Sequence, residues 1–140
     1  MANNFNEYLR NAVLNHVFGD VLFDSPGTLY LGLSTTPIAD NGTGETEPVG
    51  GGYARQALAN NKTTWSSAAG ANNFVTNAAE ITFPESSGAW GNITHFFISD
   101  GVTGGNIFIS GALTTPKDIN AGDVARFPID SIRIELDDIA

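Results

Sequence analysis

Residues 49–56, VGGGYARQ, place three successive glycines directly before Tyr53 and Arg55. Glycine-rich loops hold phosphate groups when they follow a strand, open a helix and carry the spacing of a P-loop or of a dinucleotide fold. Here the glycines lead into YARQALA, whose alternating pattern is typical of a strand. The pattern therefore predicts a hinge at the end of a loop and disfavours a nucleotide site.

Arg55 is one of only six basic side chains in 140 residues. A guanidinium near a sheet is usually paired with a carboxylate, and Asp100 and Asp123 are candidate partners. Both aspartates stand beside turn glycines, however, and we favour a role in which each accepts hydrogen bonds from its own turn. The partner of Arg55 stays open between a carboxylate of its own fold and one across an interface.

Hydrolytic and metal sites find little support in the chain. His16 lies in a helical pattern and His95 in a strand pattern, and no serine on a sharp turn accompanies them. There is no cysteine and no HxH, HxxxH or HExxH spacing. We expect no enzyme activity and no cofactor. The acidic loop from Asp40 to Glu47 lacks the spacing of an EF-hand, and cation binding there stays open.

Charge and composition narrow the classes of partner. Six basic and fifteen acidic residues give a net charge of -9, which opposes binding to nucleic acid phosphates. No apolar run approaches the ~20 residues of a membrane-spanning helix, and MANNFNEYLR lacks the layout of a secretory signal. We expect one domain over residues 1–140, made in the cytoplasm, with neither a nucleic acid nor a membrane as partner.

Residues 4–18 carry apolar side chains at three- and four-residue spacings, which predicts an amphipathic helix. We expect Asn4 to cap it together with Glu7, and Gly19 to end it in a left-handed conformation. We favour packing of the apolar stripe on the core of the same domain over packing on a second copy or another subunit. Its members are Phe5, Leu9, Ala12, Val13, His16 and Val17.

Residues 28–137 change to period two, as in SIRIELD, where isoleucine and leucine alternate with charged residues. About eight such segments with turn residues between them predict an all-β fold, an antiparallel jelly-roll-like β-sandwich with one N-terminal helix. Residues 35–52 and 60–72 fit no strand and predict long surface loops.

Five stretches, taken in order, resemble a family of small virion structural proteins of tailed bacteriophages: YLRNAVLNHVFG, SPGTLYLGLSTTP, GGGYARQ, ITFPESSGAWGNITHFFISDGVTGGNIFISGALT and INAGD. The resemblance runs from about residue 8 to residue 137. Similar proteins are jelly-roll capsid cement or decoration proteins, and members are often labelled tail fibre proteins. The resemblance implies a structural protein on the outer surface of the phage head, forming a homodimer and binding the major capsid protein.

The resemblance carries over structural positions and no catalytic ones: Tyr53, Arg55, Trp90, Asp100, Gly122 and Asp123. Trp90 is either a core residue or an exposed interface anchor. In the helix, Phe5, Tyr8 and Leu9 are candidate interface residues. A tail fibre or baseplate module is the first alternative function, and a carbohydrate-binding module is the second.

Overall fold

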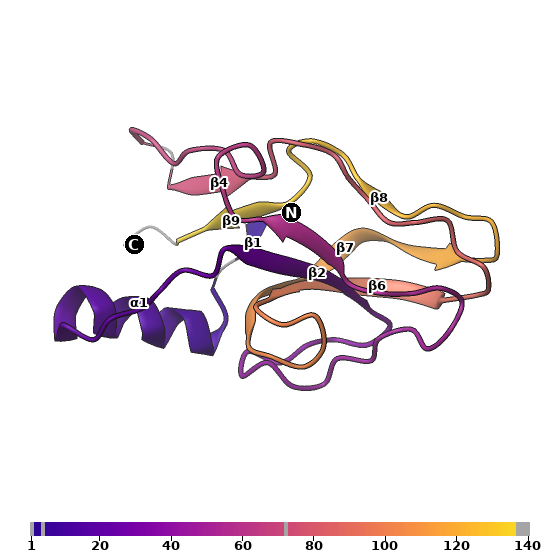
Figure 1. Cartoon of the computed structure of the whole chain (residues 1–140), viewed down its shortest axis with the longest axis horizontal. Helices are drawn as coiled ribbons and strands as arrows, with labels where there is room; N and C mark the ends of the chain where they lie inside the picture. The colour runs from indigo at the N-terminus through magenta and orange to yellow at the C-terminus, as the bar shows by residue number, and fades with distance from the viewer. Residues whose placement is uncertain (1, 4, 72, 137–140) are drawn as a thin grey trace.

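The computed structural model describes residues 2–3, 5–71 and 73–136, and this part of the chain holds one helix and nine strands (Figure 1). Their bounds are β1 Ala2–Asn3, α1 Glu7–Gly19, β2 Thr28–Ser34, β3 Gln56–Ala59, β4 Phe74–Thr76, β5 Ile81–Thr82, β6 Gly91–Ser99, β7 Ile107–Ile119, β8 Arg126–Phe127 and β9 Arg133–Glu135. No helix in these residues has both the length and the apolar character needed to span a membrane.

The main sheet has the strand order β3-β2-β6-β7 and is antiparallel throughout. Consecutive residues of β6, Phe96 and Phe97, are both fully buried, so both faces of the sheet are covered there. Phe96 packs edge-on against Phe127 of β8. Phe97 points to the opposite face, where Gly32 of β2 leaves room for its ring, because a β-carbon at Gly32 would overlap that ring.

Two smaller sheets cover the Phe96 face of the main sheet, and Figure 1 shows β4, β9 and β8 together on one side of β2, β6 and β7. One has the order β1-β9-β4 and the other pairs β5 with β8. A jelly roll packs two large sheets built from eight strands. Here a four-stranded sheet faces sheets of three and two strands, and β1 pairs with β9 in parallel. The fold is mostly β with an N-terminal helix, as predicted, but it does not show a jelly roll.

The helix starts and ends later than predicted. Its N-cap is Asn6, whose side chain makes no capping hydrogen bond, while the predicted cap Asn4 lies outside the described residues. The amide of Glu7 instead donates to the backbone oxygen of Asp40 at 3.0 Å. Gly19 is the last helical residue, and Asp20 takes the left-handed conformation with φ 54°. The prediction that Gly19 ends the helix was therefore wrong by one residue, because Asp also tolerates this conformation.

The apolar stripe of α1 packs on the core only in its first half. Leu9 is buried and Val13 is partly buried against the core, whereas His16 and Val17 are exposed. Figure 1 shows the reason, since α1 projects from one end of the long axis, away from the sheets. Core packing of the whole stripe was the wrong expectation for this second half.

The predicted loop 35–52 contains no strand and crosses the Phe97 face of the main sheet. The predicted loop 60–72 contains no strand in its described residues, where turns alternate with irregular backbone, and Trp65 forms an isolated bridge with Asn77. Trp65 is buried and belongs to the core. This tryptophan therefore anchors the second loop to the body of the fold.

Candidate functional site

Arg55 lies at the centre of a buried polar network, and its partner is Glu47. Its Nε and Nη2 donate to the two Glu47 carboxylate oxygens at 3.0 and 2.9 Å. Its Nη1 donates to Ser99 Oγ and to the backbone oxygens of Gly101 and Gly104, at 2.7 to 2.8 Å. One guanidinium thus ties the loop 35–52 and the turn after β6 to the main sheet, within a single copy of the chain.

Tyr53 and Trp90 lie next to this network, Tyr53 in contact with Glu47 and Trp90 in contact with Tyr53. The Tyr53 hydroxyl donates to Glu47 at 2.7 Å and accepts from the Leu33 amide at 2.9 Å, and burial raises the pKa of this hydroxyl above its ordinary value. Trp90 is buried, packs edge-on against Tyr53 with ring centroids 5.4 Å apart, and donates from Nε1 to the Gly51 oxygen at 2.8 Å. Trp90 is therefore a core residue and not an exposed anchor.

The glycines at positions 50–52 allow the backbone of this loop to approach Trp90 closely. Gly50, Gly51 and Gly52 all have positive φ, between 62° and 76°. A β-carbon at Gly51 would lie 2.8 Å from the Gly88 oxygen and 3.0 Å from Trp90 Cδ1. The run is thus a turn that lets two backbone segments and an indole meet closely.

The remaining positions carried over from the resemblance lie in turns. Asp100 accepts two hydrogen bonds from Asn106, one from its backbone N–H at 2.7 Å and one from its side-chain Nδ2 at 3.0 Å. Asp123 accepts one from the Asn120 amide at 2.8 Å, and Gly122 in the same turn has φ 88°. Neither aspartate pairs with Arg55, which corrects that candidate pairing. Each forms hydrogen bonds within its own turn.

Asp40, in the acidic loop, is joined to the helix. Arg10 donates from Nη1 and Nη2 to the two Asp40 oxygens, both at 2.8 Å, and from Nη1 to the Phe5 oxygen at 2.9 Å. These hydrogen bonds hold the pKa of the Asp40 carboxyl below its ordinary value. Asp40 and Glu47 therefore face different arginines, and in the described residues no three acidic or histidine side chains gather as metal ligands would.

The candidate interface residues of the helix are placed differently from one another. Leu9 is buried in the core, and Phe5 forms a bridge with Ile109 and packs against that core. Tyr8 is partly exposed and stacks on Phe108, with ring centroids 5.6 Å apart. Phe5 and Leu9 are thus engaged within the chain, and only Tyr8 offers free surface.

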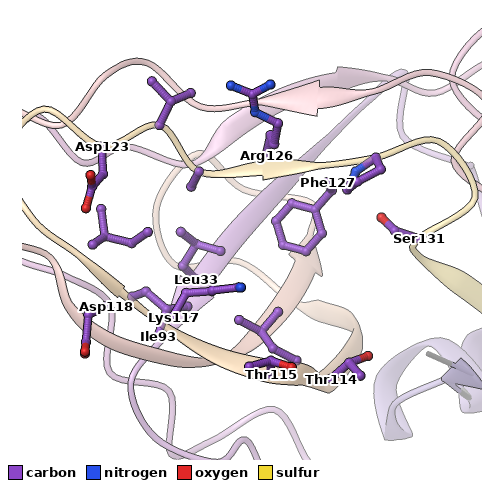
Figure 2. Close-up of a pocket in the computed structure, with 15 residues that line it drawn as sticks. Leu33, Ile93, Thr114, Thr115, Lys117, Asp118, Asp123, Arg126, Phe127 and Ser131 are labelled. Carbon is purple, nitrogen blue, oxygen red and sulfur yellow. The ribbon is translucent and has the colours of Figure 1, made fainter.

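A cleft of about 480 Å³ opens between β7 and β8 (Figure 2). It lies where β7 bulges, because Thr94 of β6 faces residues 113–116 of β7. Figure 2 shows the Phe127 ring pointing down from β8 toward Leu33 and Ile93, and the Lys117 side chain reaching into the cleft. Volumes of this size are typical of small-ligand sites. The cleft has an apolar floor, and charged residues lie at its rim.

In the described part of the chain, an exposed apolar surface lies at the far end of α1 and in the residues directly after it. We call it the apolar tip and define it as Leu14, Val17, Phe18, Val21 and Leu22. Each of the five side chains is more than half exposed, and Phe18 reaches 84%. Exposed apolar patches of this kind mark contact surfaces in soluble proteins.

The comparison with known proteins places the chain in a family. A protein-family model described as Podophage GP4 fiber I protein gp80 matches residues 4–135. The chain belongs to this fiber I family. The match includes α1 and every strand from β2 to β9, so the fiber I family model covers nearly the whole fold. The chain is accordingly a phage virion structural protein of a family named for a fibre. No curated protein matches the chain.

Two features of the site were missed in the sequence. Glu47 was considered only as a cation ligand, although the glycine turn between it and Arg55 folds the chain back and brings the two together. The apolar tip was missed because Leu14 and Phe18 lie off the predicted stripe that contains Val17. Leu14 and Phe18 were themselves the available signal, because they extend the apolar surface of the helix beyond the stripe that packs on the core.

Proposed function

We propose that this protein is a non-enzymatic structural subunit of a phage tail fibre. The observation that carries the proposal is the match of residues 4–135 to the fiber I family. The side chains carried over from the resemblance support a structural role, because Arg55, Tyr53 and Trp90 are used in hydrogen bonds and packing inside the fold. The capsid cement function, with the major capsid protein as partner, becomes the alternative.

The carbohydrate-binding alternative has weaker support. Sugar-binding sites usually stack a sugar ring on an exposed aromatic side chain. Both tryptophans, Trp65 and Trp90, are buried with less than a tenth of their surface exposed. Neither therefore provides a platform for a sugar.

Locating the protein on purified virions tests the proposal. Labelling with antibody-conjugated gold, followed by cryo-microscopy, is expected to mark the tail and leave the head surface unmarked. Quantitative mass spectrometry of the same particles supplies a second measurement. A fibre subunit is expected in far fewer copies than the major capsid protein, whereas a cement protein would be present in comparable numbers. Label over the head at such a copy number would establish the cement function instead.

A further inference from the structure

We propose that the cleft between β7 and β8 binds a small amphiphilic anion, whose apolar body lies on the cleft floor and whose carboxylate or phosphate meets Lys117. The floor is formed by Leu33, Ile93 and Phe127, each less than a tenth exposed. The cleft volume of about 480 Å³ lies above the roughly 300 Å³ at which small-ligand sites begin. Binding here is a property of the purified chain and is independent of its location on the virion.

The bulge in β7 places Lys117 beside this floor. Residues 113–116 of β7 stand opposite Thr94 alone, and this shift brings Lys117 into register with Ile93. Residues directly paired across antiparallel strands project from the same face of a sheet. The stem of Lys117 therefore starts beside Ile93, which is 2% exposed and belongs to the core. Bulges are enriched next to active sites, where they redirect a side chain in this way.

The basic side chains that lack a partner are gathered at this cleft. Of the six basic residues, three arginines form ion pairs with carboxylates and Lys62 donates to a backbone oxygen. The other two, Lys117 and Arg126, both line the cleft, and neither makes a hydrogen bond or an ion pair in the described part of the chain. Figure 2 shows Lys117 reaching into the cleft, while Arg126 leaves β8 on the side away from β7. Lys117 is therefore the group placed to meet a bound anion.

The two aspartates that line the cleft are already engaged within the fold. Asp118 accepts a hydrogen bond from Asn92 Nδ2 at 2.9 Å, and Asp123 accepts one from the Asn120 backbone N–H at 2.8 Å. Figure 2 shows both aspartates at one end of the cleft and the Lys117 ammonium directed away from them. The positive charge of Lys117 is thus left for an anion from outside the described part of the chain.

The lining of the cleft selects the class of ligand. The apolar floor favours a hydrocarbon body, because covering it removes apolar surface of both molecules from water. An inorganic anion would pair with Lys117 and leave the floor uncovered, and a neutral hydrocarbon would cover the floor and leave Lys117 unpaired. The phosphates of a nucleic acid are opposed by the net charge of -9. A small molecule that joins an apolar body to one anionic group fits both parts of the cleft.

Isothermal titration calorimetry of the purified chain tests the proposal with octanoate, octyl phosphate, octan-1-ol and octylammonium. The two anions are expected to bind about tenfold more tightly than the alcohol, as one charge-assisted hydrogen bond provides, and octylammonium most weakly. The tighter of the two anions identifies the preferred anionic group. Lys117→Gln should weaken both anions about tenfold and leave the alcohol unchanged. Lys62→Gln is the matched control, because it removes the same charge outside this cleft.

Amide chemical shifts of the isotope-labelled chain supply a second readout. Octanoate should shift residues 113–118 and 124–128, and Thr115→Trp, which adds bulk at the cleft, should abolish binding while circular dichroism shows the variant folded. Equal affinity for octanoate and octan-1-ol, wild-type binding by Lys117→Gln, or shifts confined to other residues would each overturn the proposal. It would also be wrong if only a peptide of alternating glutamate and isoleucine bound, because the cleft would then serve a protein partner. The location on the virion is measured separately, so either proposal can fail alone.

Discussion

Arg55 and Glu47 form a two-pronged ion pair across the glycine turn that separates them, with N–O distances of 3.0 and 2.9 Å. The Arg55 side chain is only 4% exposed, and its remaining donor holds the turn after β6. The loop 35–52 and the turn after β6 are therefore both held in place by the guanidinium of Arg55.

Replacing Arg55 should destabilise the isolated chain. Arg55→Ala leaves the Glu47 carboxylate with the Tyr53 hydroxyl as its donor and removes a hydrogen bond from three further acceptors. Loss of one member of a buried pair costs about 3–5 kcal/mol, and we expect a value at the lower end because the Glu47 side chain is 26% exposed. Arg55→Lys should lower the unfolding free energy by most of the same amount, because the lysine ammonium cannot reproduce the planar, two-pronged geometry of the guanidinium. Urea unfolding followed by tryptophan fluorescence measures the change. An unfolding free energy equal to that of wild type, with loss of assembly alone, would show that Arg55 acts across an interface.

Gly51 and Gly50 form a matched pair for testing the turn beside Trp90. Both have positive φ, so alanine at either site introduces backbone strain of about 1 kcal/mol. Only at Gly51 does the new β-carbon meet the Gly88 oxygen and Trp90, whereas Gly50 has open space. We expect Gly51→Ala to cost about 2 kcal/mol more than Gly50→Ala. Thermal unfolding of the two variants gives the comparison, and equal melting temperatures would count against close packing at Gly51.

Asp20 offers a stabilising change at the end of α1. It adopts a left-handed conformation and places a carboxylate at the negative end of the helix dipole. Asp20→Gly should remove both the backbone strain and the unfavourable charge, and should stabilise the fold by about 0.5–1 kcal/mol. Asp20→Ala is the control, since it removes the charge but keeps the backbone strain. Chemical denaturation should rank glycine above alanine, and the reverse order would refute the backbone argument.

Asp40 should give the stability of the chain a dependence on acid pH. Hydrogen bonds from Arg10 lower the pKa of Asp40, so its contribution is present above the unfolded-state value of about 3.9 and is lost as pH falls through the folded-state value. Asp40→Asn should therefore melt below wild type at pH 7, and the gap should narrow as the pH falls through the folded-state pKa of Asp40. The gap should be small and should narrow in high salt, because the pair is exposed. An unchanged gap across this pH range would contradict the assignment.

Periodicity in the sequence was informative where a segment packs on its immediate neighbours. Alternation in SIRIELD and in the strand patterns predicted a mostly β chain, and the spacing in residues 4–18 predicted the single helix. It could not show that α1 leaves the sheets after Val13, because that depends on how far the helix extends beyond the first residues of β7, where Tyr8 stacks on Phe108. The partner of Arg55 was equally hidden, since Glu47 carries the same carboxylate as the two candidates, Asp100 and Asp123, until the glycine turn fixes the direction of the chain.

β7 forms one edge of the main sheet, and residues 113–116 bulge out of its pairing with β6. Pro116 lies in this bulge and has no amide to offer to an incoming strand. An uninterrupted edge would invite copies of a β-rich chain to polymerise strand by strand into insoluble aggregates. We therefore expect the irregularity at this edge to disfavour amyloid-like growth wherever copies are crowded together.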